Sequence, residues 1–166
     1  NNTDDKFEKC FEYCINIAKN ILGNNSYGIA QKFINMSFKY LYCFDDAGEY
    51  DAKFEKCHMP LDKYTLNWVK TFENDKIKKG LIDIKYAWAN MEEDLYFKIQ
   101  EAISDQLKNK NNYKVDLKDG KENICLPSNK LLAEFIIWNQ EKINEIKRER
   151  KKLDESYEKL CIDLKI

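Results

Sequence analysis

The residues best suited to metal binding or nucleophilic chemistry are six cysteines and a single histidine. The cysteines stand at positions 10, 14, 43, 57, 125 and 161, and His58 directly follows Cys57. On a helix Cys10 and Cys14 would share one face, and together with Cys57 and His58 they could hold a tetrahedral zinc ion. The Cys-x-x-Cys spacing of zinc-binding knuckles is absent, and sequence neighbours rarely form a catalytic dyad. We therefore expect reduced core cysteines, His58 in a loop, no metal and no cofactor, in a cytoplasmic protein.

Two further residues suit amine and carboxylate chemistry, namely Lys32 and Asp62. Lys32 lies inside a long apolar segment, and a lysine in such surroundings has a lowered pKa and becomes a usable nucleophile. Asp62 ends the sequence His-Met-Pro-Leu-Asp, where a helix is expected to begin. A carboxylate at a helix N-terminus is kept ionised by the backbone N–H groups and the helix dipole. The candidate neighbours of such a site are Gln31, Asn35 and His58.

The stretches GIAQK at 28–32 and HMPLD at 58–62 together resemble the catalytic half of the helix-hairpin-helix DNA glycosylases. In that family a glycine-bearing hairpin leads into a helix with a lysine, and a later turn places an aspartate at the start of the next helix. The resemblance implies that Lys32 attacks the sugar and forms a Schiff base. It implies that Asp62 activates the lysine or stabilises the oxocarbenium-like sugar, and that the partner is DNA with a flipped base. Ala30 stands where the family has its second hairpin glycine.

The same residues also have a structural interpretation. Ser26 and Asp62 are favourable N-cap residues, and Leu61 and Leu66 have the spacing of a hydrophobic staple around the second cap. In this interpretation Lys32 is a surface residue on the solvent stripe of its helix. The members of that stripe are Lys32, Asn35 and Lys39.

Hydrophobic periodicity predicts an all-α fold, a compact multi-helix domain that spans residues 1–166 with one small hairpin near 108–126. We expect helices at 4–22, 27–44, from 62 onward, at 91–107, and from 128 to the end of the chain. Asn90 and Ser128 are the expected caps of the last two helices. Residues 76–90 suit a helix or a strand equally well.

The segment 128–166 is predicted to be one long helix with a heptad seam. The seam residues are spaced four and three apart: Leu132, Ile136, Asn139, Ile143, Ile146, Arg150, Leu153, Tyr157, Leu160 and Leu164. We expect the first half to pack into the domain and the second half to dock on the N-terminal helix. The alternative is that the second half projects and pairs, as a coiled coil, with a protein partner or with itself. In that case the projecting helix predicts a non-catalytic helical interaction or regulatory protein, with Trp88, Tyr96 and Trp138 as exposed recognition residues. The same three aromatic residues fit a place in the core equally well.

Composition narrows the other classes of function. The chain has 28 Lys and Arg against 29 Asp and Glu, so its net charge of −1 gives no overall footprint for nucleic acid. The basic run KRERKK at 147–152 is a separate option for binding nucleic acid without catalysis. No run of 18 apolar residues occurs, and the polar start has no signal-peptide pattern, so we expect no membrane partner. The leading hypothesis is a DNA-binding helical protein with a glycosylase-like or lyase-like site, and whether it is an enzyme stays open.

Overall fold

The computed structural model describes residues 4–23, 26–44, 54–72, 88–109, 112–117 and 120–164. Its elements are α1 (Asp4–Leu22), α2 (Tyr27–Phe44), α4 (Lys63–Val69), the 3₁₀ helix η1 (Trp88–Asn90), α6 (Glu93–Lys108), β1 (Asn112–Leu117), β2 (Gly120–Cys125) and α7 (Lys130–Leu164). The fold is mainly α, as predicted, and the antiparallel hairpin of β1 and β2 falls within the expected range 108–126. The choice between helix and strand for 76–87 lies outside the described residues.

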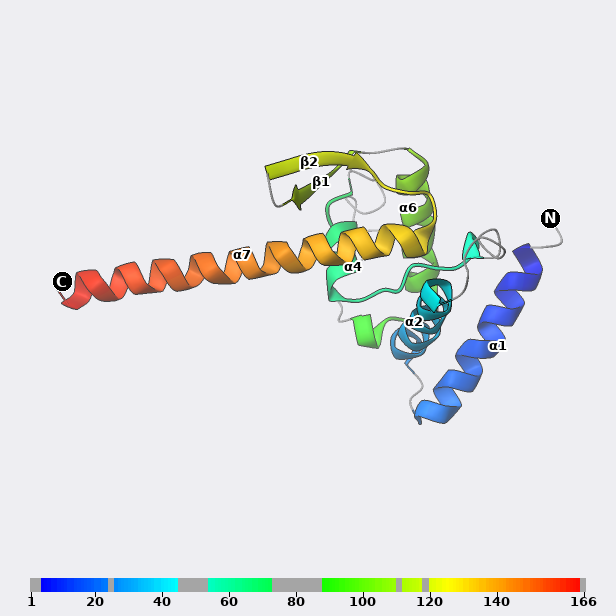
Figure 1. Cartoon of the computed structure of the whole chain (residues 1–166). Helices are drawn as coiled ribbons and strands as arrows, with labels where there is room; N and C mark the ends of the chain where they lie inside the picture. The colour runs from blue at the N-terminus through cyan, green and yellow to red at the C-terminus, as the bar shows by residue number, and fades with distance from the viewer. Residues whose placement is uncertain are drawn as a thin grey trace.

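A compact body carries one long projection (Figure 1). In the body α1 packs against α2, and α4 and α6 pack against the first part of α7. The last part of α7 extends away from the body, on the side opposite α1. The expected docking of this part on the N-terminal helix is therefore wrong, because α1 turns its apolar residues Phe11 and Ile15 into the body instead.

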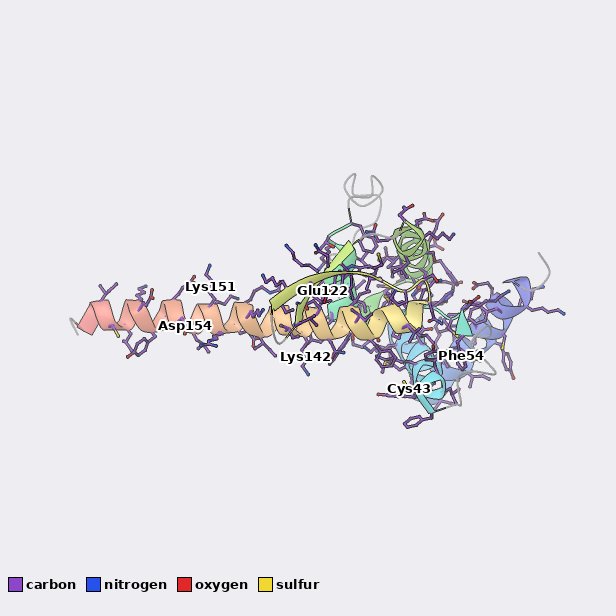
Figure 2. The ribbon with its side chains drawn as sticks, turned by 45° about the horizontal axis from the view of Figure 1, so that its top comes forward. Cys43, Phe54, Glu122, Lys142, Lys151 and Asp154 are labelled. Atoms are coloured by element: carbon purple, nitrogen blue, oxygen red, sulfur yellow. The ribbon has the colours of Figure 1, made fainter. Side chains whose placement is uncertain are left out.

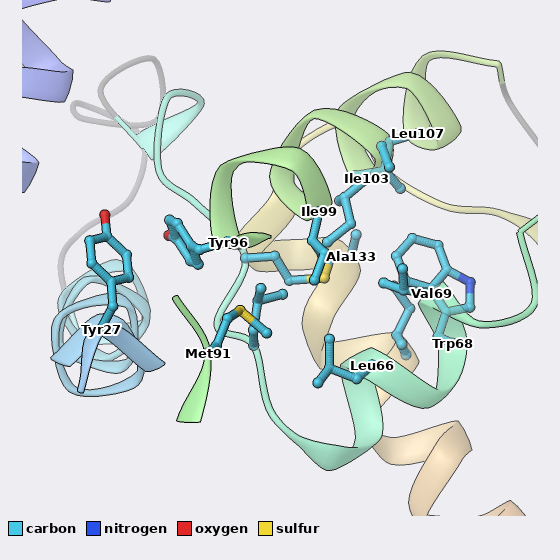
Figure 3. Packing of buried hydrophobic residues seen from close by; sticks show 14 of the residues in the cluster. Tyr27, Leu66, Trp68, Val69, Met91, Tyr96, Ile99, Ile103, Leu107 and Ala133 are labelled. Carbon is cyan, nitrogen blue, oxygen red and sulfur yellow. The ribbon is translucent and has the colours of Figure 1, made fainter. Parts of the chain in front are cut away.

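The hydrophobic core forms where α4, α6 and α7 meet (Figure 3). Leu66 and Val69 of α4 belong to one buried cluster with Ile99 and Ile103 of α6 and Ala133 of α7. Burial of such side chains supplies the main driving force for folding. α7 enters this cluster with its first turns, keeps polar contacts with the body as far as Lys147, and projects beyond that residue.

Helix α2 is buried on its polar side. Gln31, Asn35 and Lys39 are buried, which makes the prediction of a solvent stripe wrong for Asn35 and Lys39. The exposed side chains of the same helix include large apolar residues, namely Phe33, Tyr40, Leu41 and Phe44. The physical reason is that each buried polar side chain has a hydrogen-bond or ion-pair partner in the body, which offsets the cost of removing it from water.

The boundaries of α1 and α2 follow the predicted signals. α1 ends at Leu22, and Gly23 after it has φ 59°, a left-handed conformation that glycine adopts without strain. α2 begins after Ser26, whose Oγ accepts a hydrogen bond from the backbone N–H of Ile29 at 3.4 Å. Both ends were predictable because their signals are local in the sequence.

Two predicted caps are wrong by one or two residues. Asn90 does not cap α6, because it is the last residue of η1, and α6 begins at Glu93 with Glu92 as its N-cap. Ser128 does not cap α7, because the side-chain oxygen of Asn129 accepts hydrogen bonds from the first free N–H groups of the helix. Among the described helices, none combines the length and the apolar character that a membrane span requires.

Candidate functional site

The residues 57–62 form a buried extended segment without regular secondary structure. Such a segment must find hydrogen-bond partners for its backbone, since water is excluded. The amide of Gln100 in α6 donates to Met59 O at 2.7 Å and accepts from Met59 N at 3.1 Å. The amide of Gln31 in α2 makes the same two bonds with Leu61, at 2.9 Å and 3.2 Å. Two glutamine side chains therefore do for this segment what neighbouring strands do in a sheet, and Pro60 between them has no N–H to satisfy.

His58 lies outside regular secondary structure, as predicted, and it is buried in the core. Its Nδ1 lies 2.8 Å from the hydroxyl of Tyr96, and its Nε2 lies 3.5 Å from a carboxylate oxygen of Glu8. Asn35 donates to the same hydroxyl at 2.9 Å, which leaves the hydroxyl proton for Nδ1 and assigns the ring proton to Nε2. Burial lowers the pKa of His58 below its ordinary value, against an opposing effect of Glu8. The rings around it belong to Phe7, Phe11, Tyr96 and Phe97.

Lys32 and Asp62, thirty residues apart in the chain, are in direct contact. The Nζ of Lys32 lies 2.5 Å from Oδ2 of Asp62, and the two side chains are 26% and 9% exposed. The indole N–H of Trp138 in α7 donates to the same oxygen at 3.1 Å. The ring centroid of Trp88 in η1 lies 5.7 Å from the lysine Nζ, within cation–π range. The ion pair therefore lies between two half-buried indoles.

Asp62 is also the N-cap of α4, as predicted. Its second oxygen, Oδ1, accepts from the backbone N–H groups of Tyr64 at 2.9 Å and Thr65 at 3.1 Å. The backbone N–H of Asp62 donates in turn to the hydroxyl of Thr65 at 2.8 Å, which completes a capping box. The carboxylate thus has one oxygen fixed by the helix start and the other facing Lys32.

A second ion pair, Lys39 with Glu134, was missed by reasoning from the sequence. Lys39 lies seven positions after Lys32, about two helical turns, so both lysines are on one face of α2. Glu134 belongs to α7, and burial raises the pKa of its carboxyl, against a lowering effect of Lys39. A signal was present, because Glu134 is the only charged residue in the run LLAEFIIW at 131–138. A lone charge in a core segment requires a buried partner.

Gly28 marks a close approach of two backbones. Its N–H donates to Met91 O at 3.0 Å, and a Cβ built on it would lie 1.9 Å from the carbonyl oxygen of Trp88. Only glycine fits between α2 and η1 at this point. The amide of Gly28, which the resemblance assigns to a phosphate-binding hairpin, is thus already bonded within the chain.

The aromatic and cysteine residues play structural roles where they are buried. Tyr96 is fully buried, so its interpretation as an exposed recognition residue is wrong, while Trp88 and Trp138 are half-buried. All six cysteines are free thiols, and burial raises the pKa of Cys57 to about 12, which keeps this thiol protonated and unreactive. Within the described residues no group of three or more His, Cys, Asp or Glu side chains could hold a metal ion.

A shallow hollow of about 310 Å³ lies at the end of α1 and the start of α6. Its lining residues are Lys19, Ser26, Tyr27, Asn90, Met91, Glu92 and Glu93. Lys32 and Asp62 are not among them. The Lys32–Asp62 ion pair is partly exposed and does not line this hollow.

The distal segment of α7, residues 146–160, is exposed along its whole length. Four large apolar side chains lie on it: Ile146, Leu153, Tyr157 and Leu160 are 55%, 70%, 69% and 53% exposed. Figure 2 shows Lys151 and Asp154 on the part of the helix that extends clear of the body. The last described contacts with the body are those of Glu145 with Lys63 and of Lys147 with Asp116.

The sequence matches no protein-family model, and neither a curated protein nor a solved structure matches the chain. The resemblance to the helix-hairpin-helix glycosylases stays a prediction, since these comparisons do not bear on it. Function is therefore inferred from the geometry of the chain itself.

Proposed function

We propose that this protein acts by binding another α-helix through the distal segment of α7. The observation that carries the proposal is the stripe of four exposed large apolar side chains on a segment that no other described element covers. Each such side chain left in water forgoes about 1.5–3 kcal/mol of burial. With Arg150 between Ile146 and Leu153, the stripe follows the four-three spacing that packs into the holes of a facing helix.

The stability of the segment supports the same proposal. The last described tertiary contact of the helix is the ion pair of Lys147 with Asp116, and a helical stretch of the length beyond it is marginal in water. Ion pairs such as Lys151 with Glu155, at 3.6 Å, add about 0.3–0.5 kcal/mol each. A facing helix would bury the apolar stripe and stabilise the helical conformation of the segment. Binding of a helix therefore explains why an exposed segment carries large apolar side chains.

Site-specific photo-crosslinking tests the proposal. A photoreactive side chain that replaces Leu153, on the stripe, should crosslink the chain to the protein that supplies the facing helix. The same adduct should form in cells that express the chain and after the chain has been purified together with that protein. The matched control places the same group at Glu155, two residues on and about 200° around the helix. An adduct at Leu153 but not at Glu155 supports the proposal. No adduct at Leu153, or equal adducts at both positions, overturns it.

A second candidate function, amine-dependent lyase chemistry on DNA, is favoured by the 2.5 Å contact between Lys32 and Asp62. In this candidate Asp62 takes a proton from Lys32, and the free amine attacks C1′ of an abasic sugar to form a Schiff base with loss of water. Borohydride reduction should then trap the chain on abasic-site DNA. The informative variant is Lys32→Arg, because arginine keeps a cation beside Asp62 and cannot form the Schiff base. No adduct with the wild-type chain, or an adduct that persists in Lys32→Arg, would sink this candidate.

A further inference from the structure

We infer that the helix bound by the distal segment is the same segment of a second copy of this chain, and that the two copies run antiparallel. This inference rests on the proposed function and adds the identity and the orientation of the partner. The evidence is the charge pattern beside the seam.

The seam assigns each residue of α7 a heptad position. The first positions are Ile143, Arg150 and Tyr157, and the fourth positions are Ile146, Leu153 and Leu160. The fifth positions, on one flank of the seam, are Lys147 and Asp154. The seventh positions, on the other flank, are Lys142, Glu149 and Ser156. Flanking positions set the orientation of a coiled coil through their charges.

A parallel pair would place like charges together. In that orientation a seventh position meets the fifth position of the next heptad of its partner. Lys142 would meet Lys147 of the second copy, and Glu149 would meet Asp154, each twice. Arg150 would also face the second Arg150 inside the seam. These repulsions disfavour the parallel orientation.

An antiparallel pair removes the like-charge contact in the seam. Arg150 then faces Leu153 of the second copy, and Ile146 faces Tyr157. Every layer of the seam contains at least one apolar side chain. The stem of Arg150 covers apolar surface while its guanidinium reaches water at the edge.

The flanks become complementary in the same arrangement. Fifth positions meet fifth positions, so Lys147 lies opposite Asp154 of the second copy, and symmetry repeats this pair. Glu149 meets the uncharged Ser156 rather than another acid. Lys147 lies 2.9 Å from Asp116 of its own chain, yet its side chain is 55% exposed and so is accessible at the rim.

The body leaves the seam accessible. Ile137 is fully buried and marks the face of α7 that packs on the body. Ile146 follows nine residues later, about 900° or two and a half turns around the helix, and so lies on the opposite face. Residues 146–157 are all exposed, so a second helix can overlap this segment, a length of about 18 Å, and comes close to the body only at Lys147, which is paired with Asp116.

Asp154→Lys distinguishes the two orientations because they predict opposite effects. In the antiparallel pair the new lysine faces Lys147, so the dimer should weaken, by about tenfold for two reversed pairs. In a parallel pair it would face Glu149, and the dimer would tighten. Sedimentation equilibrium of the full chain at low salt measures the dissociation constant. Glu158→Lys is the matched control, since it makes the same charge change away from the seam and its flanks, breaks no ion pair described for this segment, and should alter the constant less than about twofold.

Each outcome is decisive. A weakened Asp154→Lys dimer beside an unaltered Glu158→Lys dimer supports the inference, and so does recovery of affinity in Lys147→Asp combined with Asp154→Lys. A tightened Asp154→Lys dimer, or equal effects of the two lysine variants, overturns the antiparallel orientation. A wild-type chain that stays monomeric at all concentrations overturns self-pairing. The photo-crosslink at Leu153 to a different protein would then still support the proposed function.

Discussion

Replacing Gln100 by leucine should destabilise this protein, although leucine is a more apolar side chain of similar size in a core position. Gln100 is 3% exposed and makes two hydrogen bonds with the backbone of Met59, at 2.7 Å and 3.1 Å. Met59 is itself fully buried. Water therefore cannot take over these bonds without opening the core.

The magnitude follows from the two groups left unpaired. A buried backbone donor and a buried backbone acceptor without partners cost about 2 kcal/mol each, or about 4 kcal/mol together. A buried leucine in place of the amide returns about 2 kcal/mol of hydrophobic free energy. The net loss is about 2 kcal/mol, which for a chain of this length lowers Tm by roughly 4–8 °C. Gln31→Leu should behave alike, because Gln31 makes the same pair of bonds with Leu61.

Urea unfolding followed by tryptophan fluorescence measures this loss. The control is Gln106→Leu, a half-buried glutamine on the same helix, for which the described part of the chain shows no hydrogen bond to the side chain. Its free energy of unfolding should change by less than about 0.5 kcal/mol. A Gln100→Leu chain that unfolds at the wild-type urea concentration, or above it, refutes the role of the glutamines in holding residues 57–62.

Three further predictions concern other contacts. Gly28→Ala should lower Tm, because the added Cβ would lie 1.9 Å from the carbonyl oxygen of Trp88. This overpacking costs more than the gain of about 1 kcal/mol in helix propensity, and an unchanged Tm contradicts the prediction. His58, the single histidine, has a folded-state pKa lowered by burial, so the unfolded chain takes up the proton first and stability is lost as pH falls below about 6.5, by up to about 1.4 kcal/mol per pH unit. His58→Gln should flatten that slope in urea titrations between pH 5 and 7, and an unchanged slope would assign it to other groups. Asn129→Ala should cost about 1 kcal/mol through loss of the α7 cap, whereas Ser128→Ala should cost almost nothing, and the reverse order in thermal melts would restore Ser128 as the cap.

The sequence predicted what depends on local signals. The bounds of α1 and α2 agree with the expected ranges 4–22 and 27–44, because Gly23 and Ser26 act on the helix ends next to them. The cap at Asp62 was predictable for the same reason. Cap positions at Asn90 and Ser128 failed where a neighbouring turn or a better acceptor competed for the same N–H groups.

The buried face of α2 could not be predicted, because its partners are distant in the chain. Asn35 bonds Tyr96, and Lys39 pairs with Glu134, across 61 and 95 residues of sequence. A polar stripe beside apolar residues looks the same whether it faces solvent or a set of matched polar groups. The contact of Lys32 with Asp62 was a candidate from the sequence, and its catalytic role stays a prediction.

Because α7 is one unbroken helix, its residue spacing fixes the direction in which the seam faces relative to the body. One helix runs from Lys130 to Leu164, so each inserted residue rotates everything beyond it by about 100° and advances it by about 1.5 Å. Seven residues inserted near 145 would move the stripe outward by about 10 Å with almost the same phase. Two residues would rotate it by about 200° and turn it toward the side of the body. The number of residues between core and stripe therefore sets the direction in which the stripe faces, just as the side chains set what it can bind.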